Sequence, residues 1–257
     1  MNRISILWLA PKHFKSPFAG LVPFFLVWLL FCVPNSNSSL PLCNRYDCVN
    51  FSIEKSARST FPELKGFRMG RLRGFRRVFA HVAPIFFQRG IAKPLTKEIS
   101  SLSVEPCADE TLIITVFEIS LNEIPDFMDR EIEFRFLTVT PETLDGEPFQ
   151  KPAVLCARYS DEEFFQVRCK GSKDMYFNLY GKYNIDRIWR DDILPCRTYL
   201  RHCVLAAKKL GNEAYENFLD HTFLGDRETT IRQYLETSGA GIMEEDPPEF
   251  LRSRYGG

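Results

Sequence analysis

The stretch from Thr111 to Val139, TLIITVFEISLNEIPDFMDREIEFRFLTV, constrains the fold most, because it encodes two strands around a short helix. Residues 112–117 form a β-branched and aromatic run of strand length. Residues 134–139 alternate as a strand does when both of its faces are partly covered. Between them, Ser120 and Glu123 form a capping box, which predicts that a helix begins there.

The predicted helix ends in the charged triplet Asp129-Arg130-Glu131, just before the second strand. Pro125 removes one amide donor past the first turn, so this helix is expected to be short. A carboxylate buried at such a helix end would have a raised pKa and would suit general acid-base catalysis. The alternative is a solvated helix end with an Asp–Arg or Arg–Glu surface pair, which local sequence alone favours.

Composition predicts one globular domain with additional segments. The chain has 257 residues, and 45% of them are hydrophobic. Its 33 basic and 33 acidic residues cancel, so there is no global attraction to nucleic acid or to an anionic membrane. The 23 phenylalanines predict a core rich in aromatic rings.

Cysteines and known motifs give no indication of a metal or a cofactor. None of the eight cysteines forms a C-x-x-C pair, and no histidine spacing beside them suggests zinc. Cys43 and Cys48 alone are close enough in a predicted loop for a local disulfide. The sequence also contains no P-loop, G-x-G-x-x-G, H-E-x-x-H or G-x-S-x-G. It therefore permits acid-base chemistry without a cofactor or metal.

The amino-terminal part contains a charge-free run, Phe18–Val33, after a basic start. We expect residues 1–34 to form a signal or anchor segment whose apolar helix does not pack on the domain, because such a helix has no polar face for water. Residues 35–50 are expected to be a linker. A retained anchor, a cleaved signal and a mispredicted first exon remain open. A retained anchor would associate the protein with a membrane, and a mispredicted first exon would leave the protein cytoplasmic.

A basic and aromatic stretch, Ser56–Arg89, could bind single-stranded nucleic acid by charge and stacking. The competing interpretation is a strand and turn whose arginines face water. We favour the latter, because acidic residues elsewhere cancel the charge and no RNP-type motif is present. Nucleic acid is therefore not an expected partner.

The rest of the chain changes from strands to helices. Residues 153–158 and 163–169 are predicted to be short strands, and Thr198–Leu210 is predicted to be a helix with one apolar face. Two further helices are expected near residues 215–219 and after a cap at Asp226. The globular domain is thus assigned to residues 51–238, and residues 239–257 are expected to be a tail.

Three motifs in this order resemble the γ-glutamylcyclotransferase-like superfamily, which includes the ChaC-like glutathione-degrading enzymes. The segment VFEISLNEIPDFMDREIEFRF resembles the family's strand and its helix ending near L-D-x-x-E. The segment LPCRTYLRHCVLAAKKLGNEAYENFL resembles the family's carboxy-terminal helix pair, and GFRRVFA resembles the strand that follows its glycine loop.

The resemblance implies a fold, a reaction and a catalytic residue. The fold would be α+β, a small mixed β-barrel with helices packed outside it. The reaction would cyclise a γ-glutamyl amine or peptide to 5-oxoproline and release the amine, without a cofactor or metal. Glu131 would stand at the position of the family's catalytic glutamate, and the partner would be a small γ-glutamyl substrate.

The sequence departs from the family at the glycine loop that holds the glutamyl end of the substrate. Phe51 and Ser52 stand at the expected position as candidate substrate-binding residues, but the glycine is missing. Phe134 also stands where many members have tyrosine. These departures support an alternative from another class, a membrane-tethered, non-catalytic binding module on the same fold. The sequence therefore leaves open whether the protein is an enzyme, and the retained Glu131 favours that it is one.

Overall fold

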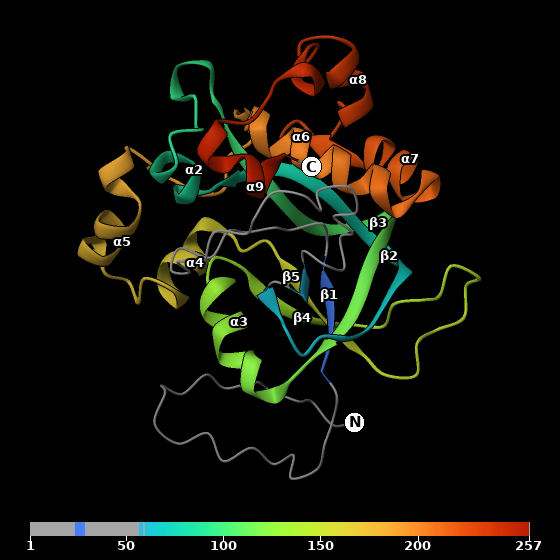
Figure 1. Cartoon of the computed structure of the whole chain (residues 1–257). Coiled ribbons are helices and arrows are strands. Elements are labelled where there is room, and N and C mark those ends of the chain that lie inside the picture. Colours follow the sequence, from blue (N-terminus) through green and yellow to red (C-terminus); the bar gives the residue numbers. More distant parts are fainter. Residues whose placement is uncertain (1–23, 29–56, 59, 257) are drawn as a thin grey trace.

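Two long antiparallel strands form the centre of the molecule (Figure 1). The computed structural model describes residues 24–28, 57, 58 and 60–256, with side chains from residue 57 onward. Strand β2 (Lys65–Val82) pairs with β3 (Glu98–Ile119), and three shifts of register interrupt the ladder. One shift lies between Arg73 and Phe75, at Gly74, whose φ of 81° suits glycine. Such bulges increase the local twist, and the β2–β3 ribbon curls.

The other strands extend this ribbon into one mixed sheet. The strand order is β4-β5-β1-β3-β2-β7, and β6 pairs with β3. The bounds of the added strands are β1 (Phe24–Trp28), β4 (Arg135–Val139), β5 (Ala153–Ala157), β6 (Leu194–Pro195) and β7 (Thr222–Leu224). The pairs β1–β5, β2–β7 and β3–β6 are parallel, and the others are antiparallel.

The expectation of a separate apolar helix at the amino terminus is wrong for residues 24–28. These residues form β1, which lies between β3 and β5 in the sheet. The physical reason is that FFLVW is rich in aromatic residues and contains the β-branched Val27, and both kinds of residue favour strands. The rest of the apolar run, and the possible disulfide of Cys43 with Cys48, lie outside the described residues. Within the described part of the chain, no helix has the length and apolar character that crossing a membrane requires.

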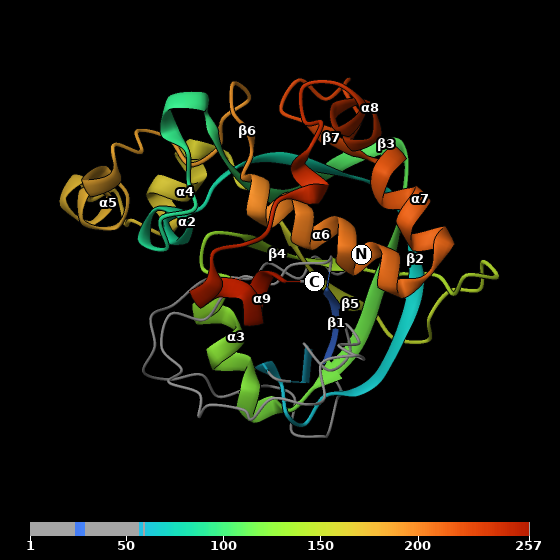
Figure 2. The same cartoon turned by 45° about the horizontal axis from the view of Figure 1, so that its top comes forward.

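Helices α6 and α7 cross the β2–β3 ribbon in the carboxy-terminal third (Figure 2). Helix α6 (Arg197–Leu210) buries Tyr199, Leu200 and Cys203 among others, and helix α7 (Asn212–Asp220) buries Ala214, Phe218 and Leu219. These faces match the predicted helices. The ring of Tyr199 lies 6.2 Å from that of Phe79 on β2, so the apolar face of α6 closes the core over the sheet.

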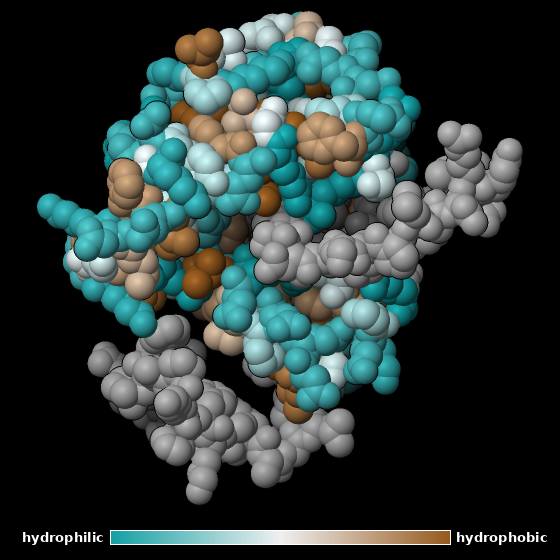
Figure 3. Space-filling view, turned by 60° about the vertical axis from the view of Figure 1, so that its left-hand side comes forward, coloured by the Kyte–Doolittle hydropathy of each residue, from teal (hydrophilic) through white to brown (hydrophobic). Residues whose placement is uncertain are grey.

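The remaining helices are short. They are α2 (Pro84–Gln88), α3 (Ile124–Arg130), α4 (Asp161–Val167), α5 (Lys173–Leu179), α8 (Ile231–Glu236) and α9 (Arg252–Tyr255), with single 3-10 turns η1 (Pro94–Thr96), η2 (Leu121–Glu123), η3 (Gly181–Tyr183), η4 (Ile242–Glu244) and η5 (Glu249–Leu251). Helices α4 and α5 project together at one side of the molecule, and apolar residues gather on the face they share (Figure 3).

Two local predictions, one at α4 and one at α8, were wrong, and in both a capping side chain explains the difference. Residues 163–169 belong mainly to helix α4 instead of a strand, because Ser160 and Glu163 form a capping box that starts a helix. Helix α8 is capped by Thr230 instead of Asp226. The Asp226 carboxylate instead accepts hydrogen bonds from the backbone of Glu228 and Thr229.

The segment expected to be a tail, 239–257, packs on the domain as far as it is described. Tyr255 is fully buried and its hydroxyl accepts a hydrogen bond from Nη1 of Arg89 at 2.8 Å. Ile242 is also fully buried, and the ring of His202 on α6 meets that of Tyr255 edge-on. An aromatic anchor of this kind holds the carboxy-terminal segment against α6, so the domain extends beyond residue 238.

The fold class is therefore α+β, as predicted, with helices packed on the sheet. The sheet is curled and mixed, but among the described strands β4 and β7 stand at its two ends and do not pair with each other. Within the described residues, the small barrel of the prediction is thus a curled sheet whose two end strands do not pair. This arrangement brings the end of α3 and strand β4 to one side of the curl (Figure 1).

Candidate active site around Glu131

Glu131 is placed by the strand–helix–strand unit that the sequence predicts. Ser120 caps the turn η2, and its backbone amide donates to the Glu123 carboxylate at 2.8 Å. The chain then enters α3, whose seven residues agree with the short helix expected from Pro125. The Glu131 amide donates to the carbonyl of Phe127 at 3.0 Å, which ends the helix with the Glu131 side chain turned into the protein.

The Glu131 carboxyl is buried, with only 5% of the residue exposed. Nε of Arg130 donates to Oε1 of Glu131 at 3.2 Å, and the Arg130 guanidinium lies 4.5 Å from the centre of the Phe61 ring. Burial raises the pKa of Glu131, while the charge and hydrogen bond of Arg130 act against this rise. The nearby Glu133 carboxylate adds to the rise, and the net pKa lies above the ordinary value.

The interpretation of this helix end as a solvated surface pair is therefore wrong for Glu131. Asp129 is exposed, but Arg130 and Glu131 form their ion pair with side chains only 10% and 7% exposed. A carboxyl that is buried, paired with one arginine and raised in pKa is a candidate for accepting and returning a proton. This is the chemistry of a general acid-base group.

Cys156 on β5 lies in the same environment and is an unsuitable nucleophile. The residue is 8% exposed and its thiol is free. Burial raises the pKa of Cys156 well above its ordinary value, and the charge of Glu131 raises it further. The thiol therefore stays protonated at neutral pH, and the thiolate is the nucleophilic form.

A second polar group lies beside Glu131, and local sequence gave no signal for it. His81 on β2 and Ser101 on β3 are direct partners in the β2–β3 ladder, and Nδ1 of His81 shares a hydrogen bond with the Ser101 hydroxyl at 2.6 Å. Nε2 of His81 lies 3.1 Å from Oε2 of Glu133, within ion-pair distance but out of line for a hydrogen bond. The Tyr180 hydroxyl donates to Oε1 of Glu133 at 2.7 Å.

The aromatic ring of Phe134 packs against this group. Its ring centre lies 5.0 Å from that of His81 and 5.6 Å from that of Trp189, and the residue is 3% exposed. The ring thus contributes packing beside His81. The predicted substrate-binding residues Phe51 and Ser52 lie outside the described residues.

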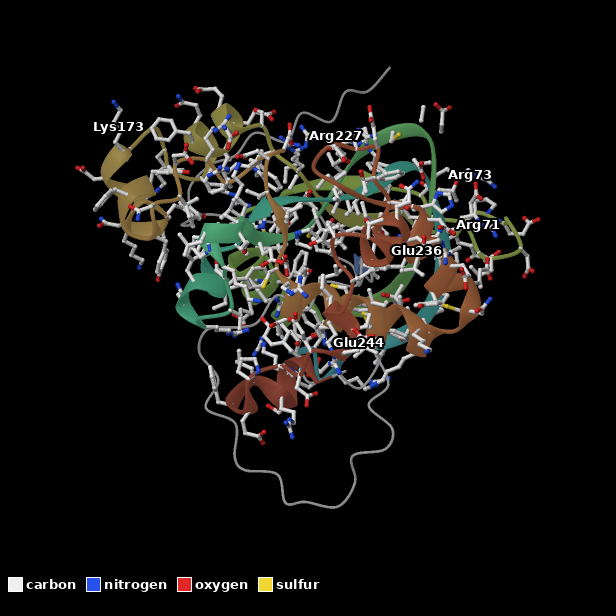
Figure 4. The ribbon with its side chains drawn as sticks, turned by 90° about the horizontal axis from the view of Figure 1, so that it is seen from above. Arg71, Arg73, Lys173, Arg227, Glu236 and Glu244 are labelled. Atoms are coloured by element: carbon white, nitrogen blue, oxygen red, sulfur yellow. The ribbon has the colours of Figure 1, made fainter. Side chains whose placement is uncertain are left out.

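The arginines of the basic stretch on β2 are distributed over several ion pairs. Arg71 lies 3.4 Å from Glu213, Arg73 lies 3.0 Å from Glu142, and Arg76 lies 2.7 Å from Glu105. Arg71 and Arg73 lie together at the opposite end of the molecule from Lys173 on α5 (Figure 4). Each of these guanidinium groups therefore has an acidic partner from another part of the chain.

Arg77, from the same stretch, is fully buried under α7. It donates to the backbone carbonyl of Ile113 and, at 3.1 Å, to the side-chain oxygen of Asn217. Burial lowers the pKa of Arg77 to about 9. This arginine ties α7 to the sheet and is withdrawn from any ligand in solvent.

A surface hollow of about 290 Å³ lies on α7 and does not include Glu131. Its lining comes from β2, β3 and α7: Arg71, Thr111, Ile113, Glu213, Glu216, Asn217, Asp220 and His221. The three acids of α7 in this hollow are paired with arginines, Glu213 with Arg71 and the other two with Arg232. With its charges already paired, the hollow is a weaker candidate site than Glu131.

Metal ligands are not gathered anywhere in the part of the chain that the structure describes. There, no group of three or more histidine, cysteine, aspartate or glutamate side chains is placed to hold an ion.

Comparison with known proteins gives structural likeness without sequence likeness. No family model and no curated protein matches this sequence. Among solved structures, a gamma-glutamyl cyclotransferase matches with a TM-score of 0.36 and 12% identity, over 66% of this chain and 90% of that one. An uncharacterized protein from Homo sapiens matches with a TM-score of 0.33 and 13% identity, over 54% and 83% of the two chains.

The first of these structures bears the name of the family that the motifs resemble. At TM-scores below 0.5, neither likeness assigns a residue role or a reaction to this chain.

Proposed function

We propose that this protein is a γ-glutamylcyclotransferase-like enzyme that converts a γ-glutamyl amine or peptide to 5-oxoproline and releases the amine. The observation that carries the proposal is the state of Glu131. It stands where the sequence resemblance expects the catalytic glutamate, it is buried, and burial raises its pKa. A surface glutamate would show neither property.

The reaction is intramolecular, so the protein has to fold the substrate and move one proton. The α-amine of the glutamyl group attacks its own γ-carbonyl, and a five-membered lactam forms as the C–N bond to the leaving amine breaks. The Glu131 carboxylate takes the proton from the attacking amine and then delivers it to the leaving nitrogen. The two transfers cancel, and Glu131 returns to its starting state.

Arg130 supports the first transfer and burial supports the second. Its hydrogen bond to Glu131 at 3.2 Å stabilises the carboxylate that accepts the proton. Burial stabilises the protonated form that gives the proton back. The opposition of these two effects suits a group that has to exchange a proton within one reaction cycle.

The glutamyl end of the substrate requires a separate binding region, to which we assign Phe51 and Ser52 as candidates. The Ser52 hydroxyl and the backbone amides of this segment can donate hydrogen bonds to a carboxylate. The assignment rests on the sequence resemblance.

The test is a search for 5-oxoproline by mass spectrometry after incubation of the full-length protein with γ-glutamyl dipeptides, γ-glutamyl amines and glutathione. The matched control substrates are the corresponding α-glutamyl dipeptides. Their γ-carboxyl is a free carboxylate, so it carries no amine that cyclisation could release. Release of 5-oxoproline from γ-linked substrates alone supports the proposal. Failure with every γ-linked substrate, by protein whose folding is verified by circular dichroism, contradicts it and favours a non-catalytic binding module.

A further inference from the structure

Four polar side chains from separate parts of the fold form a connected array beside Glu131. Nδ1 of His81 and Oγ of Ser101 are 2.6 Å apart, and the Ser101 hydroxyl also lies 3.3 Å from the carbonyl oxygen of His81. On the other side of the ring, Nε2 of His81 is 3.1 Å from Glu133, which also accepts a hydrogen bond from Tyr180 at 2.7 Å. Strand β2, the turn after α3 and the end of α5 thus meet at the Glu133 carboxylate, and β3 joins them through the contact of Ser101 with His81.

Burial of this array shows that packing alone does not explain it. His81 is 2%, Tyr180 3% and Ser101 5% exposed, and the side chain of Glu133 is 19% exposed. Withdrawing these polar groups from water costs free energy, which the hydrogen bonds of Ser101 and Tyr180 offset only in part, because Nε2 of His81 makes none. Apolar side chains would fill the same space at lower cost. A buried polar array of this kind is typical of a site whose charge and geometry matter.

The array is mechanically linked to Glu131 through one turn. Glu133 follows Glu131 by two residues, and the amide of Phe134 closes the turn by donating to the Glu131 carbonyl at 3.0 Å. Nη2 of Arg168 donates to the carbonyl of Phe134 at 3.0 Å and holds the far end of the turn. A shift of Glu133 therefore shifts the backbone that carries Glu131.

The array is also linked to Glu131 by charge. The Glu133 carboxylate raises the pKa of Glu131 and His81 lowers it, in addition to the larger effects of burial and Arg130. The groups that act on Glu131 or on which it acts come from four elements: Arg130 of α3, Glu133 of the following turn, His81 of β2 and Cys156 of β5. The charge of Arg168 also acts on Cys156.

We propose that His81, Ser101, Glu133 and Tyr180 form a positioning array for Glu131, which holds the turn after α3 and sets the charge that the Glu131 carboxyl experiences. The proposal rests on the proposed function, in which Glu131 carries the proton. The serine, histidine and carboxylate also have the connectivity of a nucleophilic triad. Ser101, however, is an interior residue of β3 that donates back to its own strand partner, so we assign it to positioning.

The test is a titration of the Glu131 carboxyl by NMR in the full-length protein labelled with 13C at the glutamate side chains. The spectrum of Glu131→Gln identifies the Glu131 signal. In Glu133→Gln the Glu131 midpoint should fall by about one pH unit, the size expected for loss of a nearby charge. In His81→Asn, which keeps a polar atom near the position of Nδ1, the midpoint should rise.

Glu142→Gln is the matched control, because it removes a carboxylate that pairs with Arg73 elsewhere on the molecule. Opposite shifts in Glu133→Gln and His81→Asn, with no shift in the control, support the array, and general loosening of the fold would not produce them. Shifts in the same direction, or no shifts, overturn it. Labelling of Ser101 by a fluorophosphonate probe, abolished in Ser101→Ala, would also overturn it in favour of a nucleophile.

Tyr180→Phe tests the positioning role by kinetics, because it changes no charge. It removes the hydrogen bond to Glu133 and leaves every charge in place, so kcat should fall about 10-fold, while the acidic limb of kcat/KM keeps its position on the pH axis. An unchanged kcat would overturn the positioning role of Tyr180. If the NMR shifts are opposite but the wild type releases no 5-oxoproline, the array stands and the proposed function is rejected. If the wild type releases 5-oxoproline but the variants show no NMR shifts, the proposed function stands and the array is rejected.

Discussion

Nε of Arg130 and Oε1 of Glu131 lie 3.2 Å apart, and both side chains are almost completely withdrawn from water. Neighbouring residues in a chain seldom form a buried ion pair, because the backbone directs their side chains differently. Here the change from helix to turn at Glu131 allows it, since Glu131 is the cap residue of α3. The pair leaves a single carboxyl whose protonation responds strongly to its surroundings.

Glu131→Gln should increase stability at neutral pH. The pKa of Glu131 in the folded protein is raised above its ordinary value of 4.5, so its stabilising contribution is complete below pH 4.5 and is lost as the pH rises through the folded-state pKa. The loss is about 1.4 kcal/mol for each unit of pKa shift. Urea unfolding at pH 4 and pH 8 should show a gain for the variant that is larger at pH 8. An equal effect at both values would contradict the raised pKa.

Leu26→Pro should destabilise the domain, because β1 lies between β3 and β5. Proline has no amide hydrogen, so a carbonyl of a neighbouring strand would lose its donor inside the sheet. The expected cost is about 1–3 kcal/mol, measured as a fall of the thermal midpoint. The exposed residue Leu95 in η1 offers a control position, since Leu95→Ala should change little. A domain indifferent to Leu26→Pro would mean that the segment does not belong to the sheet.

His202→Gln should remove part of the acid sensitivity of the fold. Burial under Tyr255, with Lys209, Arg254 and Arg201 nearby, lowers the pKa of His202 from 6.5 to about 4. Its stabilising contribution is complete above pH 6.5 and is lost as the pH falls towards 4. Between pH 6.5 and pH 4, protonation of His202 should lower the free energy of unfolding of the wild type by about 3 kcal/mol, and the variant should not show this loss. Equal pH dependence of both proteins in chemical unfolding would refute this.

Glu105→Gln should destabilise the fold at neutral pH. Burial opposes ionisation of Glu105, but hydrogen bonds from Arg227 and Arg76 outweigh it and lower the pKa. The stabilisation is therefore complete above pH 4.5 and is lost at lower pH. We expect a loss of about 2 kcal/mol at pH 7 that shrinks towards pH 2. Glu228→Gln is the control, because it changes an exposed carboxylate next to Arg227 in the sequence, and equal effects of the two variants would contradict the role of the pairs.

Local features of the sequence were sufficient to predict what depends on neighbouring residues. The capping box at Ser120, the short helix α3 and the buried face of α6 are confirmed, because caps and helical periodicity act within a few residues. The prediction of a strand at residues 163–169 was wrong, because the capping box at Ser160 starts a helix there.

Features that depend on distant residues could not be predicted from one sequence. The pairing of His81 with Ser101 follows from the register of β2 and β3 and from a bulge between Phe79 and His81. The burial of Glu131 depends on the packing of β5 and of the segment around Phe61 against the end of α3. Residues 24–28 fit a helix and a strand equally well by composition, and their pairing with β3 and β5 decides for the strand.

The central claim is that Glu131 carries the proton in a γ-glutamyl cyclisation. The direct measurement is kcat/KM for 5-oxoproline release by the wild type, Glu131→Gln and Glu142→Gln, with folding of each verified by circular dichroism. We predict a loss of about 10²–10⁴-fold in Glu131→Gln and wild-type activity in Glu142→Gln. Activity of Glu131→Gln within about twofold of the wild type would contradict the assignment of this residue.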